Sequence, residues 1–168
     1  MKAFGLIAGS ALLLAACAGQ QETTTPPGTI STINVTTDLQ SIGNAESVRY
    51  WQSLDQDLEA ALATEFLGSI DPQGALLTVD VDEIALANAY SAGFGGEDSR
   101  LAGQVALADP VTERITQVYT VSATSREAAS MLSGADGVVT VSPDSDAFYE
   151  ALVQAFARGV AQAVRQGS

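Results

Sequence analysis

Residues 142–164 read SPDSDAFYEALVQAFARGVAQAV, and this stretch carries the strongest structural signal in the chain. Its apolar residues recur at the spacing of one helical face. They are Phe148, Leu152, Ala155, Phe156, Gly159, Val160, Ala163 and Val164. Ser142 suits the N-cap of a helix, and Pro143 suits its first position. The stretch therefore predicts a long amphipathic helix that packs along a sheet.

Three stretches before this helix alternate apolar and polar residues and predict β-strands, namely 75–87, 101–108 and 115–123. In the first, the alternation changes phase before Ile84, which predicts a β-bulge near Glu83. Short turn sequences separate the strands, so we expect them to form an antiparallel meander.

The first part of the domain contains a strand and a helix. Residues 30–37 are rich in β-branched side chains and predict a strand, whereas the pattern of 46–67 is helical, with Asn44 as N-cap and Gly68 as C-cap. A short helix is expected at 125–132. The order β-α-β-β-β-α-α predicts a two-layer α+β sandwich, in which two long helices cover one face of a mostly antiparallel four-stranded sheet. Residues 29–168 are expected to form this single domain.

Two aromatic side chains of the first long helix are predicted to face opposite ways. Neighbouring residues on a helix point about 100° apart, so Tyr50 and Trp51 cannot both face the sheet. Trp51 belongs to the apolar stripe, which leaves Tyr50 as a candidate surface residue for partner contact. Ordinary surface tyrosine is the alternative.

Missing residue types exclude most enzyme chemistry. The chain has no histidine, no lysine after Lys2 and no cysteine besides Cys17. Ser-His-Asp and Cys-His sites, HExxH metal sites and lysine Schiff bases are therefore impossible. We predict no catalytic residue and no cofactor, although a hydrolase that uses only carboxylates remains open.

The charge is strongly acidic. The 20 acidic residues outnumber the 7 basic ones and give a net charge of −13, so nucleic acid is disfavoured as a partner. The carboxylates of Asp80, Asp82 and Glu83 could bind a cation, but they fit the solvated face of a strand and lack the glycine turn of an EF-hand loop. We predict no metal site.

One loop is a second candidate for partner contact. The glycines around Phe94 resemble a phosphate loop, but Glu97 and Asp98 follow them and would oppose anion binding. An exposed aromatic side chain between glycines can anchor a protein partner, so Phe94 is a candidate contact. Core packing of Phe94 is the alternative.

The amino terminus is typical of a bacterial lipoprotein precursor. Lys2 precedes an apolar run that is too short to span a bilayer, which indicates a signal peptide over residues 1–16. Leu14-Ala15-Ala16-Cys17 resembles the lipobox of bacterial lipoproteins. That resemblance implies cleavage between Ala16 and Cys17 and lipid on the Cys17 thiol. Two or more acyl chains hold a protein on a membrane stably.

Residues 17–28 are expected to tether the domain to the membrane. The eleven residues after Cys17 reach at most roughly 37 Å when extended, and a flexible chain of that length averages about 18 Å. By resemblance to lipoprotein sorting rules, Ala18 after the cysteine implies the outer membrane, with the domain facing the periplasm.

Lipobox, tether and element order together resemble several groups of small envelope lipoproteins, including auxiliary and assembly lipoproteins of transport and cell-wall systems. The resemblance implies a non-enzymatic lipoprotein that binds or positions a protein partner in the cell envelope. The alternative is a component of an envelope transport system that binds a small ligand or lipid. That alternative requires an apolar cavity between the helices and the sheet.

Overall fold

The computed structural model describes residues 28–37, 41–42, 50, 52–86, 99–132, 141–143 and 145–167. Several sequence predictions lie outside these residues and stay predictions. They concern the signal peptide, Cys17, the cap at Asn44, the orientation of Trp51 and the loop around Phe94.

Four long strands form one sheet in the spatial order β1-β3-β4-β5. Their bounds are Ile30–Thr36 for β1, Ala75–Ala85 for β3, Arg100–Ala108 for β4 and Ile115–Thr124 for β5. The predicted meander is confirmed, because β3-β4 and β4-β5 pair antiparallel. β1 pairs parallel with β3, as expected when a helix crosses over between two strands. The two-residue β2, Ser41–Ile42, pairs with the same edge of β3 farther along.

The predicted β-bulge is present in β3. Val81 lies opposite Gly103 and Glu83 lies opposite Ala102, so Asp82 has no partner in the register. At this point the two backbones approach closely. A Cβ atom on Gly103 would overlap the carbonyl oxygen of Asp80 and would lie 3.0 Å from the Cα atom of Val81.

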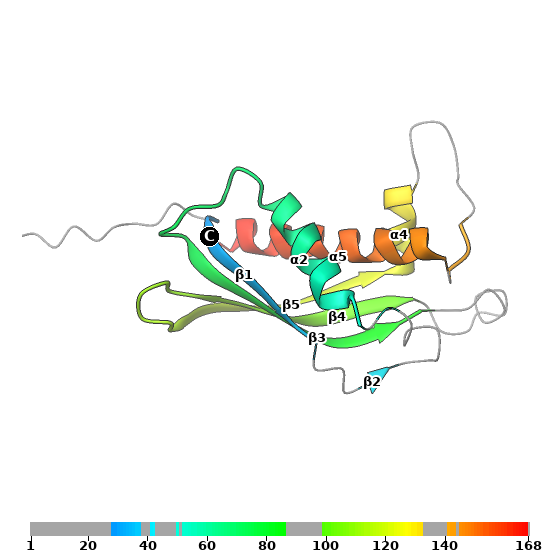
Figure 1. Ribbon diagram of the computed structural model, residues 1–168, viewed down its shortest axis with the longest axis horizontal. Helices are drawn as coiled ribbons and strands as arrows, with labels where there is room; N and C mark the ends of the chain where they lie inside the picture. The colour runs from blue at the N-terminus through cyan, green and yellow to red at the C-terminus, as the bar shows by residue number, and fades with distance from the viewer. Residues whose placement is uncertain are drawn as a thin grey trace, which may run out of the picture.

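Three helices cover one face of the sheet, as Figure 1 shows: α2 (Leu54–Glu65), α4 (Ser125–Leu132) and α5 (Asp146–Gln166). α5 contacts β4 and β5 on one side and α2 and α4 on its others. The predicted two-layer α+β fold with two long helices on one face is confirmed. In the part of the chain that the structure describes, no helix is both long enough and apolar enough to cross a membrane.

Both long helices begin later than the sequence indicates. α5 is capped by Ser145 rather than by Ser142, because the Ser145 Oγ accepts a hydrogen bond from the Phe148 backbone N–H at 3.2 Å. The Ser145 N–H donates to the Ser142 carbonyl oxygen and closes a turn before the helix. α2 begins at Leu54 after a turn at residues 52–53, so the prediction of one continuous helix over 46–67 is wrong, while residues 46–49 lie outside the described residues.

The close approach at Gly103 gives a test of the register. Gly103→Ala is expected to lower the free energy of unfolding by about 2 kcal/mol, because the added methyl overlaps rigid backbone atoms. Urea denaturation measures the change. Gly159→Ala is the matched control: its Cβ would meet only the Val121 side chain, at 3.1 Å, and alanine favours the helix by about 1 kcal/mol. Equal effects of the two substitutions would contradict the register.

Candidate functional site

An open groove of about 700 Å³ lies between α2 and α5, on the helical layer. Small side chains on both helices make room for it, among them Ala60 and Ala61 of α2 and Ala157 of α5. The groove lies between two helices and carries several carboxylates along its walls. It therefore differs from the apolar cavity between helices and sheet that a lipid-binding component would need.

Two tyrosines, Tyr50 and Tyr149, line one end of the groove. The rings of Tyr50 and Tyr149 stack with their centroids 4.1 Å apart and their planes 12° from parallel. Each hydroxyl donates a hydrogen bond to a carboxylate on another element. The Tyr50 hydroxyl bonds the Asp146 Oδ1 at 2.7 Å, and the Tyr149 hydroxyl bonds the Asp57 Oδ2 at 2.8 Å. The two bonds run in opposite directions and fasten the segment before α2 and α2 itself to α5.

Both accepting carboxylates lie in the first turn of a helix. Asp57 is in the first turn of α2 and Asp146 in the first turn of α5. The backbone N–H groups at a helix start carry partial positive charge, which stabilises a carboxylate there by about 0.3–1 kcal/mol. Each tyrosine hydroxyl therefore bonds a carboxylate that lies at the positive end of a helix.

The Tyr149 hydroxyl is held in its protonated form. Burial raises its pKa far above the ordinary value, and the hydrogen bond to Asp57 and the charge of that carboxylate raise it further. Tyr149 consequently remains a hydrogen-bond donor at every physiological pH.

The groove walls are acidic. Four carboxylates line it, from Asp57, Glu65, Asp146 and Glu150. Among its described lining residues the single basic side chain is Arg158, whose Nε lies 3.7 Å from the Glu65 Oε1. Glu150 is exposed at the opening. The negative charges exceed the positive ones along the groove and favour a cationic occupant.

The prediction that Tyr50 is a surface residue is wrong, because its side chain is 8% exposed. The helical phase used for that prediction assumed that Tyr50 lies within the same helix as the stripe. In the structure a turn separates Tyr50 from α2, and the Ser53 N–H donates to the Tyr50 carbonyl oxygen. The ring is therefore free of the helical phase and turns toward α5. The Tyr50 side chain lines the groove.

Sequence reasoning missed Tyr149 because attention fell on one face of α5. A second apolar row recurs at i+4 spacing through Tyr149, Val153, Ala157 and Ala161, all of which are buried. This row faces α2, and three of its members line the groove. A helix with two such rows is packed on two sides, and that signal was present in the sequence.

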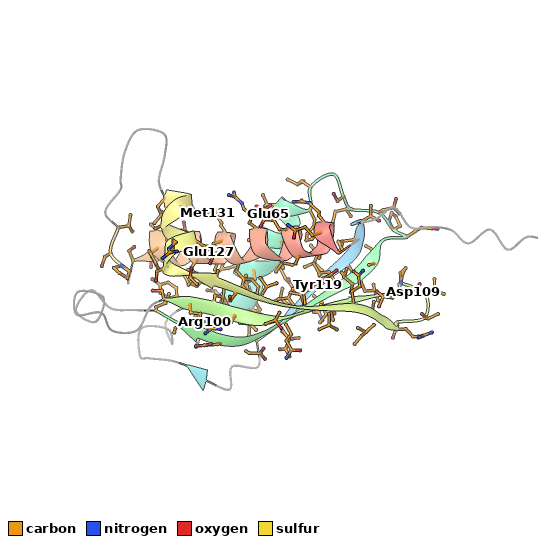
Figure 2. All side chains as sticks on the ribbon, turned by 180° about the vertical axis from the view of Figure 1, so that it is seen from behind. Glu65, Arg100, Asp109, Tyr119, Glu127 and Met131 are labelled. Carbon is orange, nitrogen blue, oxygen red and sulfur yellow. The ribbon has the colours of Figure 1, made fainter. Side chains whose placement is uncertain are left out.

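The carboxylates in β3 serve the sheet. Asp80 accepts a hydrogen bond from the Thr36 hydroxyl at 3.2 Å, and the Glu83 Oε2 lies 3.6 Å from the Arg100 Nε. Figure 2 shows Arg100 on the sheet, away from Glu65 at the groove. Within the described residues, no three potential ligands come together to hold a metal ion. The other candidate contact, Phe94, lies outside those residues.

Several solved bacterial structures resemble this one. A DUF330 protein from Xanthomonas campestris gives a TM-score of 0.47 at 12% identity, over 83% of this chain and 85% of that protein. The PelC dodecamer from Paraburkholderia phytofirmans gives 0.44 at 8% identity, over 79% and 85%. A protein from Caulobacter crescentus assigned as a lipoprotein gives 0.36 at 12% identity, over 80% and 88%.

All three TM-scores are below 0.5, so these likenesses carry no argument about the function of this chain. The sequence matches no protein-family model and no curated protein.

The tyrosine bonds can be tested through stability. Tyr149→Phe is expected to lower the free energy of unfolding by about 1–2 kcal/mol at pH 7, because Asp57 loses its donor. The pH dependence has a definite sign. The raised pKa of Tyr149 stabilises the fold fully below pH ~10, where an unfolded tyrosine ionises, and this contribution is lost as pH rises through the folded pKa.

Denaturation curves at pH 7 and above pH 10 measure both effects. The wild-type protein should lose more stability over that interval than Tyr149→Phe does. Parallel losses in the two proteins would contradict the role assigned to the hydroxyl.

Proposed function

We propose that this chain is a lipid-anchored, non-enzymatic protein of the bacterial cell envelope that binds a protein partner through a basic segment of that partner. The observation that supports this proposal is the groove between α2 and α5, which four carboxylates line and in which a stacked tyrosine pair bonds two of them. The partner's segment lies in this groove, with arginine or lysine side chains between its walls.

Charge favours a basic occupant over an acidic or a neutral one. The groove carries an excess of negative charge, and the chain as a whole has a net charge of −13. The overall field attracts a cationic segment and speeds its encounter, whereas the local carboxylates fix its position. Anionic ligands would meet repulsion at both stages.

The tyrosines add a reason for arginine. A guanidinium group bonds carboxylates with two parallel N–H donors. The hydroxyls of Tyr50 and Tyr149 hold the carboxylates of Asp146 and Asp57 in place at one end of the groove. An arginine side chain that enters this end can pair with these carboxylates.

The anchor supplies the location. Lipid on Cys17 fixes the protein to a membrane of the envelope, and we place it at the outer membrane with the domain in the periplasm. Residue 28 is the first that the structure describes, and β1 begins two residues later. The tether thus limits the domain to partners within a few nanometres of the bilayer.

A small cationic ligand is the second candidate, because a volume of about 700 Å³ also suits small-molecule sites. Such a ligand would compete with a basic peptide for the same carboxylates. An isolated amine that binds as tightly as the peptide would favour this candidate.

Peptide binding tests the proposed site directly. The full chain should bind a fluorescent arginine-rich peptide, and anisotropy should show the affinity falling as salt rises, because salt screens exposed charges. Glu150→Lys, at the groove opening, is expected to weaken binding about fivefold, from the loss of one exposed charge pair and the new repulsion.

Asp82→Lys is the matched control, since Asp82 is an equally exposed acid that does not line the groove. It changes the net charge as Glu150→Lys does and should leave the affinity nearly unchanged. Equal weakening by both substitutions would mean that the net charge of the chain, and not the groove, attracts the peptide. Peptide binding that neither substitution alters would contradict the proposed site.

Lipidation has a separate test. Cys17→Ser removes the thiol that receives the lipid, so it should abolish labelling by a fatty-acid analogue and release the protein from membranes. Membrane fractionation of cells that express each form measures the release. Unchanged membrane association of Cys17→Ser would contradict the anchor.

A further inference from the structure

The exposed apolar side chains gather at one end of the domain. The described residues include five large hydrophobic side chains that are exposed, and four of them lie in or beside two connections at one end of the domain; the fifth, Val118, lies within β5. Leu67 and Ile70, 76% and 54% exposed, lie between α2 and β3. Val111 and Ile115, 87% and 64% exposed, lie in the β4–β5 hairpin and at its edge. We call these four residues the apolar end patch.

Backbone pairing places the two connections at the same end of the sheet, at its two opposite edges. Ile70 forms a bridge with Ile30, the first residue of β1, whose strand pairs with the start of β3. The start of β3 lies beside Ala108, and Ala108 is paired with Ile115. Figure 1 places the start of β1, the β4–β5 turn and the C-terminus at the same end of the molecule. The patch therefore occupies the end at which the chain enters the domain.

The hairpin presents Val111 in a fixed position. The Asp109 Oδ1 accepts hydrogen bonds from the N–H groups of Val111 at 3.0 Å and Thr112 at 2.7 Å, and from the Thr112 hydroxyl at 2.9 Å. These bonds hold the pKa of Asp109 below its ordinary value. Figure 2 shows Asp109 at the end of the molecule opposite Met131 and Glu127 of α4. The turn holds an aliphatic side chain outward.

On the sheet face opposite α2, α4 and α5, apolar residues are more frequent toward the same end. At the entry end Ala108 pairs with Leu76 and with the exposed Ile115. Farther along the strands Asp80 pairs with Gln104, and most exposed residues on this face are polar, apart from Val118 beside Ala106. The apolar surface is concentrated where the tether joins.

We propose that the apolar end patch lies against the surface of the bilayer that holds the lipid of Cys17. The proposal rests on the proposed lipid anchor. The eleven residues from 18 to 28, which end at the start of the described chain, reach at most roughly 37 Å. A tether of this length keeps the entry end near the bilayer at high effective concentration. Four aliphatic side chains there lose contact with water when they enter the interfacial region.

The charges around the patch specify the kind of lipid. Asp71, Asp109 and Glu113 flank it, and Arg114 is the nearby base in the hairpin. An anionic surface would repel this end, whereas a zwitterionic surface such as phosphatidylethanolamine would not. Contact with a zwitterionic leaflet is therefore compatible both with the apolar side chains of the patch and with the negative charges around it.

This placement orients the groove. The C-terminal end of α5 lies at the patch end of the molecule, and its N-terminus lies at the other (Figure 1). A helix of 21 residues is about 31 Å long at 1.5 Å per residue. Tyr149 and Asp146 at its start consequently stand away from the bilayer. A partner's basic segment then reaches the tyrosine end of the groove from the periplasmic side.

Spin-label accessibility tests the proposal on the lipidated full chain in phosphatidylethanolamine–phosphatidylcholine vesicles. Val111→Cys carries the nitroxide at the hairpin tip, and Arg126→Cys, exposed on α4 at the opposite end, is the matched control. At position 111 the ratio of oxygen to nickel-chelate accessibility should rise several-fold on transfer from detergent to vesicles. At position 126 it should stay unchanged. Leu67→Asp should lower the accessibility ratio of the label at 111 toward its value in detergent, whereas Leu67→Met should leave the ratio high.

The outcomes separate the patch from the anchor. If the chain carries lipid and floats with vesicles while the label at 111 stays as accessible to the nickel chelate as the label at 126, the patch proposal is overturned and the anchor stands. If fatty-acid labelling fails, the anchor and the patch proposal fall together. Dipolar broadening between labels at 111 on neighbouring copies would identify a second copy as the occupant and would also overturn the proposal.

Discussion

Burial of α5 on two sides is the constraint on which the rest of the structure depends. Leu152, Phe156 and Val160 are fully buried, and α5 packs on β4 and β5. A second row that includes Val153 and Ala157 is buried toward α2. The helix therefore needs the sheet beneath it and α2 and α4 beside it. This requirement places α2, α4 and α5 on one face, and within the described residues no helix lies on the other face of the sheet.

The two hydrogen bonds from Tyr50 and Tyr149 to carboxylates determine the shape of the contact between α2 and α5. Tyr50 and Tyr149 fasten the helices at one end, and the alanines beyond them keep the helices from filling the space between. A groove remains with carboxylates along it. The same two carboxylates accept the tyrosine bonds and line the groove. Stability and the proposed recognition thus share residues.

Much of the fold could be predicted from the sequence, because local patterns specify strands and their turns. The alternation of 75–87 predicted both β3 and its bulge, since a change of phase has only that explanation within one strand. Helix starts were less predictable. Ser142 and Ser145 both suit an N-cap, and the choice depends on a local turn in which Ser145 bonds the Ser142 carbonyl oxygen.

The groove was harder to predict from the sequence than the fold. Tyr50 and Asp146 are 96 residues apart, and Tyr149 and Asp57 are 92 apart. Periodicity shows which face of a helix is apolar but not which distant carboxylate a hydroxyl will reach. The acidic excess was evident from composition, whereas its concentration along a groove required the packing of α2 on α5.

Chemical-shift mapping tests the central claim, that the packing of α2 on α5 creates a site for a basic segment. An arginine-rich peptide is titrated into the isotopically labelled protein, and each backbone amide is followed. The account predicts that the largest shifts fall on Asp57, Glu65, Tyr149 and Glu150 along the groove. Shifts that concentrate in the β4–β5 hairpin or on the sheet face opposite α2, α4 and α5, with the groove unaffected, would contradict it.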